Sequence, residues 1–276
     1  MTVILSGFAD EISPDPRAQL ATLAAESMSH LELRSAWSVN VANFTGEQLA
    51  AFRAAVDAAG VHVSAIGSPI GKIPVDAPFG PELDRMHRVA DIAAELGTTI
   101  VRVFSFFIPA GEPPGRYRGQ VIDRMGALAR MAEEHGLILA HENEKEIYGD
   151  IPDRCADLIT AVGSPALRAT FDPANFVQCG VRPFSEAYAP IRPHLVYLQV
   201  KDALGATGEV VPAGQGDGEL RETLAALRDS GFAGFMSLEP HLAQAGRFGG
   251  FSGPEGFHRA ASALKFLLNE ASIPWQ

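Results

Sequence analysis

The sequence predicts an α/β fold, a (β/α)8 TIM barrel formed by a single domain that spans residues 1–276. Eight short apolar runs recur at a mean spacing of about 33 residues, roughly the length of one strand, one helix and two connections. Helical patterns separate these runs, and strict alternation of strand and helix predicts parallel strands. A doubly wound open sheet is the alternative, but no glycine fingerprint follows the first strand as a dinucleotide site would require.

Each predicted strand is a short run rich in apolar and β-branched residues. In chain order these runs are VILS from Val3, LELR from Leu31, VHVSAIG from Val61, IVRVFSF from Ile100, LILAHE from Leu137, RATFD from Arg168, VYLQV from Val196 and FMSLE from Phe235.

Each predicted helix has apolar residues at spacings of three and four. The helical runs are RAQLATLAAE, GEQLAAFRAAVDAA, ELDRMHRVADIAAEL, VIDRMGALARMAEEH, DRCADLITAV, LRETLAALRDS and a final FHRAASALKFLLNE that closes the ring. Pro16 behind Asp15 predicts one helix start, and Thr45 with Gln48 predicts a capping box at another. Glycines stand where five helices are expected to stop: Gly60, Gly97, Gly136, Gly163 and Gly231.

The long irregular segments all follow strands, which places them on the C-terminal face of the predicted barrel. They span residues 67–80, 106–115, 143–151, 173–183, 202–218 and 240–256. The last of them carries five glycines between Leu242 and Gly256. We expect this segment to form a mobile cover, with Arg247 and Phe248 closing on a substrate; a static surface loop is the alternative.

Composition narrows the class of protein. Lys and Arg number 22 and Asp and Glu number 33, which gives a net charge of −11 and disfavours nucleic acid and anionic membranes as partners. The N-terminus lacks the basic region of a signal peptide, and no apolar run approaches the length that crosses a bilayer. Two cysteines, Cys155 and Cys179, are too few for a disulfide framework. We therefore expect a soluble cytoplasmic protein with free thiols.

Polar side chains stand at the ends of consecutive predicted strands. Glu142 ends the fifth strand, Asp172 the sixth and Glu239 the eighth, while Gln199 lies on the seventh. A barrel would bring these residues to one rim, where crowded carboxylates repel one another unless a cation lies between them. Three carboxylates and an amide oxygen suit Mg²⁺, Mn²⁺ or a related divalent ion. The alternative is that each carboxylate caps the next helix or pairs with a nearby Lys or Arg.

Four neighbouring residues are candidates for substrate binding. Lys201 lies two residues beyond Gln199 and should face the same side, although a salt bridge with Glu239 is an equal alternative. Asn175 and His241 follow two of the carboxylates, and Arg102 lies on the fourth strand, where a buried ion pair is the alternative. His141 is expected to pack toward the helices. Glu11 and Glu32 are given no catalytic role.

Six short segments in order resemble the xylose isomerase-like TIM barrel superfamily, particularly its sugar phosphate isomerase/epimerase branch. They are FADEIS at 8–13, HENE at 141–144, FDPANF at 171–176, VKDA at 200–203, GQGDGE at 214–219 and LEPH at 238–241. The resemblance implies one divalent metal ion, Mn²⁺ or Mg²⁺ with Zn²⁺ or Co²⁺ as alternatives, held by Glu142, Asp172, Gln199 and Glu239. Members commonly have His where this chain has Gln199, and hydroxypyruvate isomerase-like members have Gln.

The resemblance also implies that Glu142 and Glu239 act as the acid and base of an isomerase or epimerase. The substrate would be a small sugar or sugar-like hydroxy-carbonyl compound, and the proton would move through an enediolate. A lyase that eliminates a group from a keto-sugar or keto-cyclitol is the first alternative, and a non-catalytic sugar-binding barrel is the second. A DNA-repair endonuclease is disfavoured because its zinc site needs several strand-end histidines. The sequence leaves the oligomeric state, including a homo-oligomer, open.

Overall fold

The predicted (β/α)8 barrel is confirmed by the computed structural model, which describes residues 2–246 and 249–276. Eight parallel strands pair in the order β1-β12-β9-β8-β7-β6-β5-β2. An isolated parallel bridge between Phe8 and Glu32 connects the two ends of this order, so the barrel is nearly closed. The barrel strands are β1 (Ile4–Gly7), β2 (His30–Leu33), β5 (His62–Ile66), β6 (Ile100–Val103), β7 (Ile138–Glu142), β8 (Leu167–Phe171), β9 (Leu195–Val200) and β12 (Phe235–Leu238).

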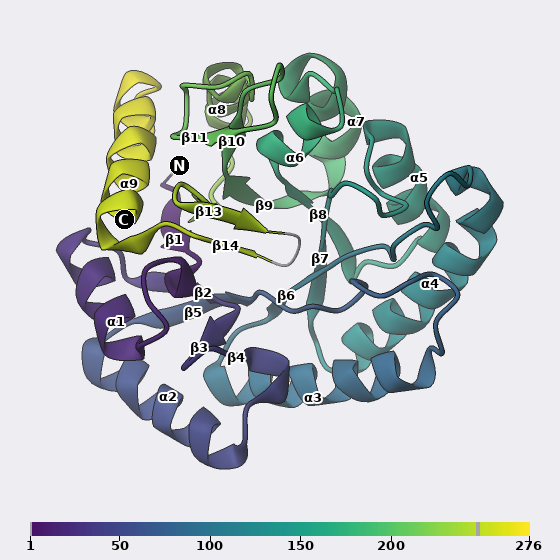
Figure 1. Ribbon diagram of the computed structural model, residues 1–276, viewed down its shortest axis with the longest axis horizontal. Coiled ribbons are helices and arrows are strands. Elements are labelled where there is room, and N and C mark those ends of the chain that lie inside the picture. The colour runs from purple at the N-terminus through teal and green to yellow at the C-terminus, as the bar shows by residue number, and fades with distance from the viewer. Residues whose placement is uncertain (1, 247–248) are drawn as a thin grey trace.

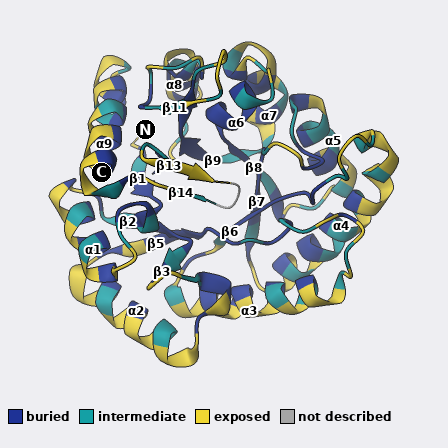
Figure 2. Ribbon diagram, in the orientation of Figure 1, coloured by how far each residue is buried: buried dark blue, intermediate teal, exposed yellow. Residues whose placement is uncertain are grey.

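Helices surround the barrel as an outer ring (Figure 1). They are α1 (Pro16–Ala25), α2 (Gly46–Ala59), α3 (Gly80–Leu96), α4 (Arg118–Glu134), α5 (Pro152–Val162), α6 (Pro173–Gln178), α7 (Ala189–Ile191), α8 (Leu220–Asp229) and α9 (Gly253–Glu270). Figure 2 shows their buried faces turned toward the strands and their exposed faces turned outward. Among the residues that the structure describes, no helix is long and apolar enough to cross a membrane.

The helix boundaries follow the expected local chemistry. Asp15 accepts a hydrogen bond from the Arg17 amide at the start of α1, and Thr45 and Gln48 form the predicted capping box of α2. Gly60 ends α2 with a φ of 64°, in the left-handed region that glycine adopts without steric cost.

Two helical segments differ from the expected pattern. Residues 173–183 were expected to be irregular, yet α6 begins at Pro173, and a π-helical turn (Pro183–Tyr188) and α7 follow it. These elements are too short to produce a recognisable helical period. The last helix, α9, begins at Gly253, four residues before the predicted run, so the end of the predicted cover segment is helical.

Three short antiparallel hairpins lie in the connections that follow barrel strands, on the C-terminal face. They are β3 (Ser35–Ala36) with β4 (Val39–Asn40), β10 (Asp202–Ala203) with β11 (Val210–Val211), and β13 (Gln244–Gly246) with β14 (Gly249–Phe251). The β13–β14 hairpin lies across the middle of the barrel in Figure 1 and forms most of the predicted cover. Arg247 and Phe248, which were expected to close on a substrate, lie outside the described residues.

One buried carboxylate organises the segment that contains β10 and β11. Asp202 Oδ1 accepts hydrogen bonds from the amides of Ala203 and Gly218 at 2.9 and 2.8 Å. Its Oδ2 accepts from the amides of Gly214 and Gly216 at 2.8 and 3.0 Å. A Cβ atom on Gly216 or Gly218 would lie within 2.6 Å of Asp202 Oδ1, so these two positions require glycine for the close approach.

The inside of the barrel is polar at mid-height. The Ser64 hydroxyl lies 2.6 Å from the Ser6 hydroxyl and 2.9 Å from the Tyr197 hydroxyl. These three hydroxyl groups therefore satisfy one another inside the barrel. The same inward alternation that orients Tyr197 orients Gln199 and then Lys201 at the mouth.

Candidate active site

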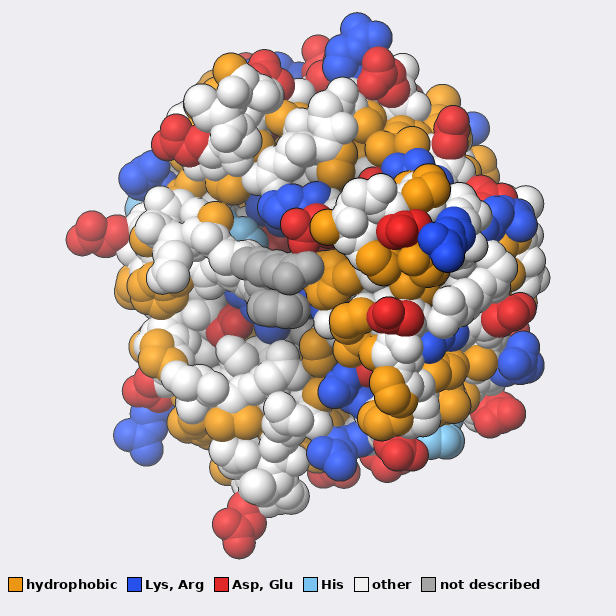
Figure 3. All heavy atoms as spheres, turned by 45° about the vertical axis from the view of Figure 1, so that its right-hand side comes forward, with side chains coloured by type: hydrophobic (Ala, Val, Ile, Leu, Met, Phe, Trp, Pro, Cys, Tyr) orange, Lys and Arg blue, Asp and Glu red, His pale blue; other side chains and the backbone are white. Residues whose placement is uncertain are grey.

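Three carboxylates meet at the C-terminal end of the barrel. Oxygen atoms of Glu142, Asp172 and Glu239 lie within 4.8 Å of one another. All three side chains are almost completely buried. They come from the ends of β7, β8 and β12, as the spacing of the predicted strands indicates, and Figure 3 shows acidic and basic side chains inside a hollow on this face.

Asparagines hold two of these carboxylates in place. Asp172 is the N-cap of α6 and accepts a hydrogen bond from the Asn175 amide at 2.9 Å, so the capping role considered from the sequence is real for this residue. Asn175 Nδ2 donates to Glu142 Oε1 at 2.9 Å. The Asn143 side chain donates to the Asp172 carbonyl and accepts from the Asp172 amide, both at 2.9 Å. These bonds fix Glu142 and Asp172 relative to each other.

A lysine lies between Asp172 and the third carboxylate, Glu239. Lys201 Nζ is 2.8 Å from Asp172 Oδ2 and 2.7 Å from Glu239 Oε2. Burial alone would lower the pKa of Lys201, but Asp172 and Glu239 raise it well above its ordinary value. The ammonium therefore stays charged, and the salt bridge with Glu239 considered from the sequence is present.

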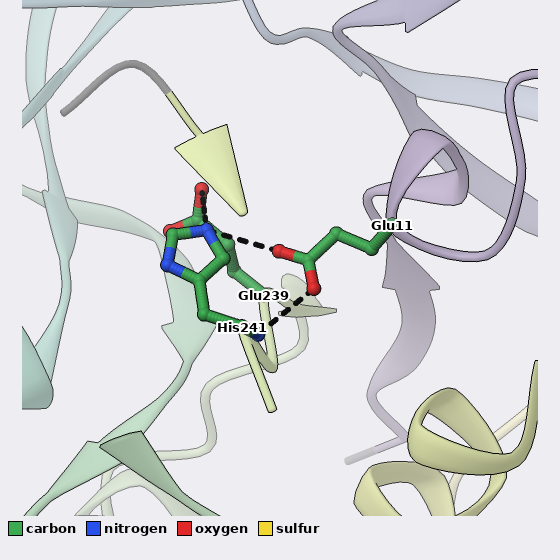
Figure 4. A group of neighbouring side chains, drawn as sticks. All are labelled: Glu11, Glu239 and His241. Carbon is green, nitrogen blue, oxygen red and sulfur yellow. Dashed lines mark hydrogen bonds and ion pairs between the residues drawn. The ribbon is translucent and has the colours of Figure 1, made fainter. Parts of the chain in front are cut away.

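Arg34 and His241 contact Glu239 from the other side. Arg34 Nη1 lies 2.9 Å from Glu239 Oε1, and His241 Nε2 lies 3.4 Å from the same oxygen. Figure 4 shows the His241 ring between Glu239 and Glu11, with its Nε2 3.0 Å from Glu11 Oε1. Burial alone would lower the pKa of His241, but these two carboxylates raise it above its ordinary value.

Arg102 faces the same site from β6. Its Nη1 lies 3.0 Å from Glu142 Oε2 and 3.9 Å from Glu239 Oε1. The guanidinium packs over Phe8 and Phe104, at 5.0 and 4.7 Å from their ring centres. Arg102 thus takes part in a buried ion pair and also lines the mouth.

The carboxyl groups experience different electrostatic environments. Burial raises the pKa of Glu142, with Arg102 opposing this effect, and burial raises the pKa of Asp172 to about 7 against the opposing charge of Lys201. Burial also acts to raise the pKa of Glu239, but Lys201, His241 and Arg34 hold it well below its ordinary value. The pKa values of Glu142 and Asp172 are thus shifted upward and that of Glu239 downward within one site, an arrangement suited to acid–base chemistry.

The donor set fits a divalent metal ion. Gln199 is fully buried, and both its Oε1 and its Nε2 lack a hydrogen-bond partner among the described residues. An unpartnered buried amide costs free energy unless a ligand satisfies it. Three clustered carboxylates and this amide are the oxygen donors that hard divalent cations prefer. A second group of Glu11, Glu239 and His241 also has donor atoms within 4.8 Å of one another.

Several site residues were not identified from the sequence. The sequence pattern does not single out Arg34 or Asn143, and it assigns no catalytic role to Glu11, which contacts His241 and Arg34. The signal for Arg34 is its position two residues beyond Glu32, directly after β2. Asn143 directly follows Glu142, where a strand-end polar residue is informative. His141 lies outside the carboxylate cluster, against Ser105 at 2.9 Å, and burial lowers its pKa to about 3.

Two cavities open beside the carboxylates. One of about 370 Å³ is lined by residues that include Asn175, Lys201 and His241, together with Ala245 and Gly246 of the hairpin. The other, of about 330 Å³, is lined by residues that include Arg34 and Arg102. All four residues expected to bind substrate therefore line a cavity at the mouth.

Comparison with known proteins places this chain in a family. The description of the family whose model matches residues 20–269 is xylose isomerase-like TIM barrel. Over 180 residues the chain is 34% identical to 2-epi-5-epi-valiolone 7-phosphate 2-epimerase from Actinoplanes sp.. This match covers 64% of each protein, less than two thirds of the relative's length.

Solved structures share the fold. A D-tagatose 3-epimerase-like protein superposes with a TM-score of 0.76 at 14% identity, covering 98% of both chains. A xylose isomerase-like TIM barrel protein from Mycobacterium smegmatis, in complex with magnesium, gives a TM-score of 0.69 at 20% identity over 98% of this chain and 96% of that one. The family match spans nearly the whole barrel, and the chain belongs to the xylose isomerase-like TIM barrel family.

Proposed function

We propose that the protein is a divalent-metal-dependent isomerase or epimerase of a small sugar or sugar-like hydroxy-carbonyl compound. The observation that carries this proposal is the cluster of Glu142, Asp172 and Glu239, whose buried oxygens lie within 4.8 Å of one another. The buried amide of Gln199, on β9 between the strands that carry Asp172 and Glu239, has no hydrogen-bond partner among the described residues and supports it. The Actinoplanes relative is named as an epimerase, which supports the same reaction class.

Glu142, Asp172, Gln199 and Glu239 would hold the metal ion. The magnesium complex of the Mycobacterium smegmatis protein, which shares the fold, is consistent with a divalent ion as the cofactor. A bound divalent ion supplies Lewis acidity, which polarises a carbonyl group and makes the neighbouring C–H bond more acidic.

The chain's own carboxyl groups would move the proton. Glu142 is held by Arg102 on one oxygen and by Asn175 on the other, and Glu239 is held by Arg34 and Lys201. Each carboxyl group therefore has a fixed orientation, which favours removal of a substrate proton by one and its return by the other. Their burial excludes water that would otherwise compete for the proton.

The surrounding polar side chains would orient the substrate. Lys201 and His241 carry donors next to Glu239, and Asn175 and Arg102 carry donors next to Glu142. Hydroxyl groups of a sugar can bind to these donors and to the carboxylate oxygens, so that the C–H bond lies between Glu142 and Glu239.

Turnover in D₂O with added Mn²⁺ or Mg²⁺ tests this function. Proton transfer through a carboxyl group predicts deuterium on the carbon next to the carbonyl, because the held proton exchanges with solvent before it returns. Isomerised product without deuterium would contradict the proton-transfer mechanism. A product that has lost one water would instead identify the lyase alternative, and the absence of any reaction across a library of ketoses would favour the sugar-binding barrel.

A further inference from the structure

Strand β14 packs closely against two side chains that contact Glu239. A Cβ atom added to Gly249 would lie 2.8 Å from Cζ and 2.9 Å from Nη1 of Arg34. A Cβ atom added to Gly250 would overlap Cγ and Cδ2 of the His241 ring. Side chains at these two positions would therefore collide with Arg34 and His241, and glycine lets the backbone of β14 reach both of them.

The guanidinium of Arg34 is enclosed between β14 and the barrel. It lies over the Phe8 ring at 4.5 Å from the ring centre. Its Nε donates to Asp10 Oδ2 at 2.8 Å, and its Nη1 donates to Glu239 Oε1 at 2.9 Å. Arg34 is only 5% exposed. A displacement of this guanidinium therefore breaks its contact with Asp10 or with Glu239.

His241 is held between β14 and the same carboxylate. Its Nε2 lies 3.0 Å from Glu11 Oε1 and 3.4 Å from Glu239 Oε1. Its φ of 46° lies in the left-handed region, which residues other than glycine adopt at a cost unless surrounding contacts hold them there. The Ser252 hydroxyl, directly after β14, donates to Glu11 Oε2 at 2.8 Å, and the His241 amide donates to the same oxygen at 2.8 Å. β14 and His241 are thus bound to one carboxylate.

We propose that Gly249 and Gly250 are positioning residues for Glu239. They act through Arg34 and His241, which contact both β14 and Glu239 Oε1. The inference rests on the proposed function, in which Glu239 moves a substrate proton. Because proton transfer requires a precisely placed carboxyl group, displacement of β14 should slow the chemical step more than it weakens substrate binding.

Kinetics of Gly249→Ala test this role. The substitution should lower kcat by about tenfold or more, while KM changes by less than about threefold. Gly253→Ala is the matched control. Gly253 also has a positive φ, 69°, but a Cβ atom added there would meet nothing closer than 3.8 Å, so this variant should keep the kcat of the wild type.

A double variant separates an effect on Arg34 from a general effect on the hairpin. Arg34→Lys keeps a positive charge beside Glu239 but has a smaller terminal group, which leaves room for a Cβ atom at residue 249. If Gly249 acts through Arg34, the double variant should lose less kcat than the product of the two single losses. Losses that simply multiply would refute the link between β14 and Arg34.

The Nε–H signal of Arg34 in heteronuclear NMR spectra gives a readout without turnover. This signal, assigned by its absence in Arg34→Lys, should exchange with solvent about tenfold faster or more in Gly249→Ala than in the wild type. Unchanged exchange, or faster exchange with unchanged kcat, would overturn the proposal. If the wild type turns over no ketose while Gly249→Ala speeds the exchange, the proposed function fails and the seating of β14 on Arg34 stands.

Discussion

Lys201 Nζ lies 2.7 Å from Glu239 Oε2, inside the group of oxygens that the family resemblance assigns to a metal ion. An ammonium and a divalent cation compete for the same negative charge, because both are attracted to the same carboxylates. Lys201→Met should therefore tighten Mn²⁺ binding by about tenfold or more while it lowers turnover. Titration calorimetry measures the affinity, and Lys145→Met, an exposed lysine bonded to Gln178, is the control. Unchanged affinity in Lys201→Met would show that the lysine and the metal occupy separate places.

Gln199 has a specific expected effect on the metal. Gln199→His should keep or tighten Mn²⁺ binding, because imidazole is a good ligand, whereas Gln199→Ala should weaken it. The same calorimetric titration compares the two variants. Equal affinities would place residue 199 outside the coordination sphere.

The two glutamates should matter more for turnover than for folding. Glu142→Gln and Glu239→Gln should each lower kcat by about a hundredfold or more, the usual scale of general acid–base catalysis. Each variant keeps a side-chain oxygen, so metal binding measured alongside distinguishes loss of the proton carrier from loss of the site. Activity close to that of the wild type in either variant argues against its role in proton transfer.

Glu32 makes stability depend on pH. It is buried on β2, and burial raises its pKa to about 8 from the model-compound value of 4.5, with Arg102 opposing this effect. The folded protein binds a proton at Glu32 that the unfolded chain releases, so this contribution to stability falls as pH rises from about 4.5 to about 8.

Replacement of Glu32 should remove that slope. The free energy of unfolding of Glu32→Gln relative to the wild type should increase from pH 5 to pH 8, by at most about 1.4 kcal/mol per pH unit. Urea denaturation with a chelator present measures this difference, and the exposed Glu134→Gln is the control. A difference that does not change with pH would contradict the assignment of a protonated Glu32.

The β13–β14 hairpin is attached at both ends to one residue, Glu11. Glu11 Oε2 accepts from the His241 amide and from the Ser252 hydroxyl, both at 2.8 Å. We expect the hairpin to cover bound substrate, so a substrate analogue should slow proteolysis between Leu242 and Ser252. Ser252→Ala should speed cleavage there in the free protein. Comparable cleavage with and without the analogue would count against a mobile cover.

The barrel was predictable because its signal repeats along the whole chain. Each strand and helix carries its own period, and strand alternation also oriented Glu142, Asp172 and Glu239 toward one rim. Arg34 was not predictable in the same way, since its partners Asp10 and Glu239 lie 24 and 205 residues away. The metal, the roles of the site residues and the mobile cover stay predictions.

The four backbone amides that donate to Asp202 have a consequence for protein engineering. The Asp202 carboxylate accepts hydrogen bonds from the amide of residue 203 and from the amides of residues 214, 216 and 218. These bonds connect the start and the end of segment 203–218 without involving residues 204–209. Residues 205–207 of that turn are exposed, so sequences of another length or charge can be grafted there while β9, which carries Gln199, keeps its position. The barrel therefore offers a replaceable surface segment in the connection that follows β9.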